Sequence, residues 1–269
     1  MKRITKWCLY LFIVAVVVSC STVAFTGRHR MLLYSNSEIS SLSAQSYYEF
    51  MSTSAPSTNA VQTAMIRDVG NRLSRALDKY LATKGQSSVL SDIKWEFYLV
   101  QSKQANAFCL PDGKVVFYEG IMPVLTTPDM IAVVMSHEMG HAIARHGNER
   151  MTQQTLTNLV GAVTGQIIEQ KTSENGRAIF ETAYTIGSQY GYLLPYSRKH
   201  ELEADEIGLY IMAIAGYDIN QAPLLWQRMA DANTTQVPEA LSTHPSDERR
   251  MKNLQKLIEK ARKFATEVR

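Results

Sequence analysis

The sequence predicts an α+β fold that is mostly helical, with a small antiparallel sheet packed beside one buried helix. Three observations lead to this expectation. The chain beyond residue 119 has the pattern of a series of helices. Residues 94–100 are rich in aromatic and branched side chains and precede the turn sequence Pro111-Asp112-Gly113, which indicates a strand and then a hairpin. Residues 129–144 are almost entirely apolar or small, which is typical of a helix buried on nearly all sides.

The amino terminus has the pattern of an export signal. Residues 2–6 are positively charged, and the apolar segment 7–18 is too short to span a bilayer as a permanent helix. The run Val17-Val18-Ser19-Cys20 resembles a lipoprotein cleavage site, which makes Cys20 the expected lipidated first residue of the mature chain. A non-cleaved amino-terminal anchor is the alternative. We therefore divide the chain into a signal peptide (1–19), a lipid-anchored tether (20–36) and a single domain (37–269).

Within this domain the elements follow from helix and strand patterns. Ser37 is the expected N-cap of a first helix, and the segment 56–59 separates it from a long amphipathic helix. We expect helices at about 37–51, 60–82, 119–125, 129–146, 150–170, 174–190, 199–215, 219–233 and 246–267, and a strand at 94–100. No repeat of about 30 to 40 residues is present.

Charge and cysteine usage limit the partners. Three of the 28 basic side chains lie in the signal, which leaves 25 basic against 25 acidic side chains. Without a basic excess to neutralise phosphates, we expect no nucleic-acid partner. Cys8 leaves with the signal and Cys20 is acylated, so Cys109 remains alone and no intramolecular disulfide is expected.

His137, Glu138 and His141 form the pattern H-E-x-x-H inside the buried helix. Each residue of an α-helix turns the side chain by roughly 100°, so the two histidines project about 40° apart and can bind one ion. Glu138 lies beside them, where it can deprotonate a water held by zinc. Burying these three side chains without partners would be costly. We therefore expect one Zn²⁺ per chain rather than a core helix with internally satisfied histidines.

A third zinc ligand is expected elsewhere in the chain. His146 is a poor candidate because, on a continuous helix, it lies about 140° further round than the second motif histidine. Glu201 and Asp205 share a helical face, which makes Glu201 the expected ligand and Asp205 the expected acceptor for the other ring N–H of a ligand histidine. Glu203 points almost the opposite way, and it remains an alternative together with Glu206. Taken alone, this acidic run would read as a solvated helix face.

These motifs resemble the membrane-associated gluzincin metallopeptidases that include HtpX, BepA, the CAAX prenyl proteases and small outer-membrane lipoprotein peptidases. The resemblance covers roughly residues 60–255. It is carried, in chain order, by Asn106-Ala107-Phe108 with the hairpin after it, His137-Glu138-Met139-Gly140-His141, Glu201-Leu202-Glu203-Ala204-Asp205, and His244-Pro245 with Arg250. Cys109 departs from the pattern, since many relatives have Ala or Ser there.

The resemblance implies further roles. The first glutamate of the third segment, Glu201, is the family's third zinc ligand. His244 is implied as a displaceable fourth ligand, with packing at the start of the last helix as the alternative. Arg250 is implied to polarise the substrate carbonyl or to hold the loop of the closing motif, with a surface arginine as the alternative. BepA-type relatives carry a tetratricopeptide scaffold, so its absence here predicts a stand-alone peptidase domain.

The combined expectation is a zinc-dependent endopeptidase of the bacterial cell envelope, with Glu138 as general base. An extended peptide would add to the edge of the strand that contains Asn106-Ala107-Phe108. Lipidated Cys20 would hold the protein on the membrane, facing the periplasm, and Ser21 after it favours the outer membrane under the enterobacterial sorting rule. Envelope assembly partners are also expected.

Two alternatives remain open at this point. One is a lipid-anchored chaperone for unfolded envelope proteins, in which the zinc site is largely structural. The other is a latent peptidase whose metal is blocked by His244.

Overall fold

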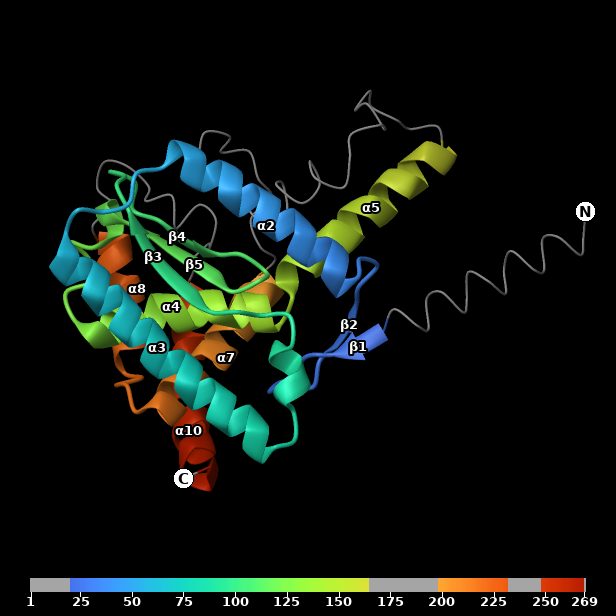
Figure 1. Ribbon diagram of the computed structural model, residues 1–269. Helices are drawn as coiled ribbons and strands as arrows, with labels where there is room; N and C mark the ends of the chain where they lie inside the picture. The colour runs from blue at the N-terminus through green and yellow to red at the C-terminus, as the bar shows by residue number, and fades with distance from the viewer. Residues whose placement is uncertain (1–19, 165–197, 232–247, 269) are drawn as a thin grey trace, which may run out of the picture.

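The computed structural model describes residues 20–164, 198–231 and 248–268 (Figure 1). The elements are β1 (Cys20–Thr22), β2 (His29–Met31), α2 (Asn36–Thr53), α3 (Ala60–Thr83), the 3-10 turn η1 (Ser87–Leu90), β3 (Glu96–Val100), β4 (Ala107–Cys109), β5 (Lys114–Tyr118), the 3-10 turn η2 (Glu119–Ile121), α4 (Pro128–Ile143), α5 (His146–Thr164), α7 (Arg198–Ala215), α8 (Gln221–Asp231) and α10 (Glu248–Val268). The expected mostly helical α+β fold is confirmed. The helix expected at 174–190 lies outside the described residues.

The sheet beside the buried helix has three strands in the order β3-β5-β4. β4 and β5 form the expected antiparallel hairpin, in which Phe108 faces Val116, and Gly113 adopts the positive φ of 95° that its turn requires. β3 runs parallel to β5, so the sheet is mixed rather than wholly antiparallel. β5 is the central strand of the three. β4 therefore lies at an edge of the described sheet.

The two faces of the sheet pack against different helices, as Figure 1 shows. Because successive strand residues point to opposite faces, Val115 and Phe117 enter the main core, which also contains buried residues of α3, α4 and α7. Val116 and Tyr118 face the other way and pack against Phe50 of α2. The buried helix α4 therefore lies between the sheet and α7.

Two glycines allow α4 and α7 to cross at close range. A Cβ added to Gly140 of α4 would lie 2.8 Å from the backbone oxygen of Ala204 on α7. A Cβ added to Gly208 of α7 would lie 3.1 Å from the backbone nitrogen of His137 on α4. Each glycine thus faces the backbone of the opposite helix, so the motif segments of the two helices meet almost backbone to backbone.

Residues 20–31 differ from the expected tether. They form the β1–β2 hairpin, in which Ser21 pairs with Arg30. The loop of the hairpin is anchored in the body: Val23 is buried, and Phe25 stacks on Tyr80 with 5.3 Å between ring centroids. Strands of three residues are too short to produce a readable alternation, which explains why sequence reasoning did not find them.

The bounds of several helices also differ from the expected ones. The first helix begins after Ser35 rather than Ser37, because Ser35 and Glu38 form a reciprocal capping box. The expected helix at 119–125 is only a 3-10 turn. The active-site helix, expected to continue to residue 146, ends at Ile143, and Arg145 has a left-handed φ of 55° before a new helix starts. This break changes the direction of the chain just after the second motif histidine.

A search of the described helices for a membrane span gave none: each falls short of the length or the apolar character that crossing a bilayer requires.

The close helix crossing gives a first prediction. Ala normally favours a helix over Gly by about 1 kcal/mol, but in Gly140→Ala the new methyl would meet the Ala204 backbone oxygen. Overpacking of this kind costs about 1–3 kcal/mol, so we expect a lower thermal midpoint by circular dichroism. Ala204→Gly should not rescue it, since the obstructing atom is backbone. A midpoint at or above the wild-type value would contradict the close crossing.

Candidate metal centre

Three buried side chains from two helices converge on one point. His137 and His141 lie one turn apart on α4, and Glu201 lies in the first turn of α7. The two Nε2 atoms are 3.1 Å apart, and each is 3.4 Å from a different oxygen of Glu201. These are the residues whose ligand atoms lie close enough together, within the described ranges, to share one metal ion.

The donor set fits a zinc ion. Two imidazole nitrogens at the usual zinc–nitrogen distance of about 2.0–2.1 Å and a tetrahedral angle would be roughly 3.3 Å apart, close to the separation of the Nε2 atoms of His137 and His141. One carboxylate completes a set of three protein ligands, which is typical of zinc sites that keep a position open for water or substrate.

The electrostatics of the two histidines also suit a cation. Burial works to lower the pKa of His137, but hydrogen bonds to Asp205 and Glu201 outweigh burial and raise it to about 9. For His141 burial dominates and holds the pKa well below its ordinary value. The carboxylates therefore stabilise a positive charge at this point, and a bound metal ion supplies that charge in place of a proton.

His137 is oriented by a carboxylate on the next turn of α7. Its Nδ1 lies 2.9 Å from Oδ1 of Asp205, so Nε2 is left to face the convergence point. Burial works to raise the pKa of Asp205, but the guanidinium of Arg250 and the His137 bond overcome it and lower the pKa. The Asp205 contact expected from the sequence is present in the structure.

Arg250 lies behind this pair on α10. Its Nε and Nη2 donate to the two oxygens of Asp205 at 2.7 and 2.8 Å, and Nη1 lies 3.1 Å from Glu201. One face of the guanidinium covers the ring of Trp226 at 3.7 Å. Arg250 is 2% exposed. These contacts describe a buried residue that holds Asp205 and Glu201 in place, so the alternative of a surface arginine is wrong, while a role in polarising a substrate carbonyl stays a prediction.

Glu138 lies between the two motif histidines in sequence and is buried at 5% exposure. Burial raises the pKa of the Cys109 thiol on β4, and the negative charge of Glu138 raises it further. The carboxylate of Glu138 therefore lies within electrostatic reach of Cys109 on β4.

His146, set aside as a zinc ligand from the sequence, is not one of the three convergent residues, but it contacts one of them. Its Nδ1 lies 2.9 Å from Nδ1 of His141, and its Nε2 lies 2.9 Å from Oε2 of Glu203. Burial is the main cause that lowers the pKa of His146 to about 4. The geometric reason for rejecting it assumed a continuous helix, but the left-handed Arg145 ends α4 and brings His146 back to His141.

The other expected residues fall in different places. Glu203 lies on the His146 side of α7 rather than at the convergence point. Glu206 bonds Tyr210 and Lys260. His244 lies outside the described residues, and β1 begins at Cys20.

The strand segment expected to bind substrate lies at the sheet edge. β4 comprises Ala107–Cys109, and Asn106 immediately precedes it. Asn106 accepts a hydrogen bond from Tyr118 through its backbone oxygen, and Leu110 donates to Lys114. Because backbone groups alternate along a strand, the N–H and C=O groups of Ala107 and Cys109 are directed away from β5.

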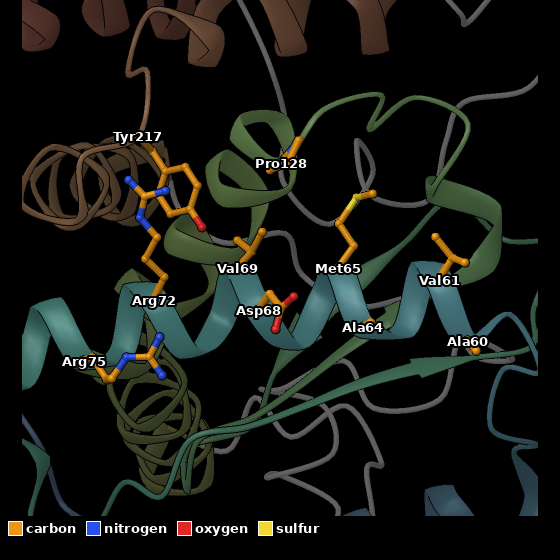
Figure 2. A pocket seen from close by; sticks show the side chains of 10 residues that line it. All are labelled: Ala60, Val61, Ala64, Met65, Asp68, Val69, Arg72, Arg75, Pro128 and Tyr217. Carbon is orange, nitrogen blue, oxygen red and sulfur yellow. The ribbon is translucent and has the colours of Figure 1, made fainter.

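A separate groove of about 760 Å³ runs along α3 (Figure 2). Figure 2 shows Val61 and Met65 rising from α3 toward Pro128, with Arg72 beside Tyr217 at the other end. Arg72 bonds the backbone oxygens of Ala215 and Gly216. The lining residues of this groove do not include any of the three convergent residues, so the groove is separate from the metal centre.

Comparison with known proteins agrees with this geometry. Residues 70–258 match the family model of Peptidase family M48. The mitochondrial metalloendopeptidase OMA1 of Schizosaccharomyces pombe is 36% identical over 192 residues, which cover 70% of this chain and 53% of that protein. Human OMA1 is 28% identical over 97% of this chain and 52% of its own length. The beta-barrel assembly-enhancing protease of Yersinia pestis is 30% identical over 76% of this chain and 41% of its own length.

The chain thus spans about half the length of the OMA1 proteins from S. pombe and human. The matched region contains α4, α7 and all of the metal-centre residues described above. Both mitochondrial and bacterial proteins are among the relatives, so the expected gluzincin-type assignment is confirmed at the level of the family, while the small-lipoprotein subtype stays a prediction. By its family match and its two-helix metal centre, this chain belongs to peptidase family M48.

Proposed function

We propose that this protein is a zinc-dependent endopeptidase. The observation that carries the proposal is the convergence of His137, His141 and Glu201 on one buried point, with the buried Glu138 next to His137 on the same helix. Within the described ranges the site has three protein ligands beside a carboxylate, which suits hydrolysis, whereas a structural zinc site is closed by four. Membership of family M48 and the names of the relatives support the same activity.

The reaction needs a proton carrier, and Glu138 has that role in the proposal. His137, His141 and Glu201 would hold the zinc ion, whose chemistry would be to acidify a water and to polarise the scissile carbonyl. Glu138 accepts the proton of the attacking water and returns it to the leaving amine. Asp205 keeps Nε2 of His137 directed at the metal, and Arg250 holds Asp205.

In the proposal, the substrate binds as an extended strand added to the edge of β4. The outward backbone groups belong to Ala107 and Cys109, and the N–H of Ala107 already bonds Oδ1 of Asn106 at 2.9 Å. An extended peptide would therefore pair mainly with the C=O of Ala107 and with both groups of Cys109. Asn106 shapes the end of the strand, and the Phe108 side chain stays on the α2 face, away from α4.

The proposed location is the bacterial cell envelope, with lipidated Cys20 on the membrane and the domain facing the periplasm. The amino-terminal sequence pattern supports it, and Ser21 supports the outer membrane. The similarity to a bacterial beta-barrel assembly-enhancing protease is consistent with this location and with envelope proteins as substrates or partners.

The role of Glu138 is tested by Glu138→Gln. The amide keeps the shape of the side chain but cannot take the proton, so kcat on an unfolded protein should fall by at least about 100-fold. Zinc content, measured by atomic emission, should stay at one ion per chain, whereas Glu201→Ala should lose the metal. Asp129→Asn makes the same carboxyl-to-amide change in the first turn of α4 and should keep activity. Cleavage by the purified Gln variant at the wild-type rate would overturn the assignment.

The substrate-binding mode is tested on the peptide rather than on the protein. N-methylation of single amides along a cleaved peptide removes one donor at a time. Methylation opposite the Ala107 carbonyl or the Cys109 carbonyl should raise KM roughly 5-fold, because one net hydrogen bond is worth about 1 kcal/mol. Methylation of the amide between them should have little effect, since that amide points away from β4. A flat profile along the peptide would argue against strand addition.

Anchoring is tested by Cys20→Ser in a bacterial host labelled with radioactive palmitate. The wild type should be labelled and partition into detergent, and the variant should lose both properties because no thiol remains for acylation. Cys8→Ser, within the signal, serves as the matched control and should remain labelled. A Cys20→Ser protein that is still acylated would exclude this anchor.

A further inference from the structure

The β1–β2 hairpin sends two arginines to the helices that carry the metal centre. Arg30 reaches the end of α4, where its Nη1 donates to the backbone oxygens of Ile143 and Ala144. Arg28 reaches α7 and α5: its Nε lies 2.7 Å from Glu203, and its Nη1 and Nη2 lie 2.8 and 2.7 Å from the two oxygens of Glu149. The hairpin therefore contacts both metal-bearing helices.

A continuous series of hydrogen bonds leads from the hairpin to a metal ligand. Arg28 and the hydroxyl of Thr26 both bind the carboxylate of Glu203, Thr26 at 2.6 Å. Glu203 lies 2.9 Å from Nε2 of His146, and Nδ1 of His146 lies 2.9 Å from Nδ1 of His141. The ion-paired side chains of this series, Arg28, Glu203 and His146, are each at most 15% exposed. Water therefore competes weakly with these bonds.

The order of the bonds sets which nitrogen of His141 carries the proton. Glu203 takes donors from Arg28 and Thr26 and can only accept from His146, so Nε2 of His146 is its donor. Nδ1 of His146 is then the acceptor, and Nδ1 of His141 must donate to it. This leaves the lone pair of His141 on Nε2, the atom that faces Glu201 and the convergence point.

A second arm of contacts closes a ring around His146. The rings of His146 and His200 stack with centroids 4.3 Å apart, and Nε2 of His200 lies 3.2 Å from Glu149. Glu149 in turn binds the same guanidinium of Arg28. The orientation of His146 is thus fixed both by its edge, through Glu203, and by its face, through His200, and both arms end on Arg28.

We propose that Arg28 of the β1–β2 hairpin is a positioning residue for the metal centre, which fixes the tautomer and the direction of His141 through Glu203 and His146. Asp205 does this for His137 from the other side, with Arg250 behind it. Each of the two ligand histidines is therefore held by a carboxylate that an arginine binds. His137 contacts its carboxylate directly, whereas His146 lies between His141 and the carboxylate of Glu203. The inference rests on the proposed zinc site.

The test measures zinc affinity of the full chain by competition with a chromogenic chelator, for wild type, Arg28→Ala, His146→Phe and the double variant. Outer contacts of this kind are worth about 10- to 100-fold in metal affinity, so each single variant should lose about 10-fold or more. The double variant should lose no more than the larger single loss, because both act through one series. Arg72→Ala, which removes an arginine bound to the loop after α7, should leave the affinity unchanged.

Two further readouts separate positioning from a general loss of structure. In the metal-free wild type, nitrogen-correlated spectra of the imidazoles should show His141 with its proton on Nδ1, and Arg28→Ala should give a mixture of tautomers. Loaded Arg28→Ala should lose kcat with KM nearly unchanged, since β4 is untouched. Arg28→Lys, which keeps the charge but not the bidentate contacts, should recover part of the affinity.

The outcomes are distinct. Independent, multiplying losses in the double variant, or wild-type affinity in Arg28→Ala, would overturn the positioning role while leaving the peptidase proposal intact. A wild-type chain that binds no zinc would instead overturn the proposed function itself. If Arg28→Ala fails to fold, Thr26→Val removes one donor from Glu203 and should show a smaller loss of affinity in the same direction, and unchanged affinity in that variant would contradict the inference.

Discussion

The metal centre depends on the close approach of α4 and α7. Gly140 and Gly208 each face the backbone of the other helix, and this lets short side chains from both helices reach one point. The His137–Glu201 and His141–Glu201 separations of 3.4 Å follow from that approach. Larger residues at either glycine would displace Glu201 and Asp205 together, because both lie on the face of α7 that looks at α4.

The buried carboxylates around the metal centre need positive charges close to them. Two arginines from opposite ends of the chain supply these charges. Arg250 on α10 neutralises Asp205 and Glu201, and Arg28 on the amino-terminal hairpin neutralises Glu203 and Glu149. Burial works to raise the pKa of Glu203 and of Glu149, but their hydrogen bonds and ion pairs lower each to about 2. An isolated buried carboxylate would not stay ionised in such surroundings.

Sequence reasoning found the parts of the site that are set by local spacing. The turn between His137 and His141, and the shared face of Glu201 and Asp205, depend only on helix periodicity. It set His146 aside as a ligand and did not foresee its contact with His141, because the left-handed residue Arg145 interrupts the helix and a positive φ at an arginine has no sequence signal. It missed the role of Arg28 because that contact spans 175 residues, and a short basic run such as Arg28-His29-Arg30 reads as surface charge. The parallel pairing of β3 with β5 was likewise a tertiary outcome.

The same long separations make the metal centre depend on two distant parts of the chain. Arg28 reaches Glu203 across 175 residues, and Arg250 reaches Asp205 across 45. Loss of either arginine would leave a buried carboxylate of α7 without its counter-charge, which is costly. The amino-terminal hairpin and the carboxyl-terminal helix are therefore structural parts of the same centre, although neither contributes a metal ligand.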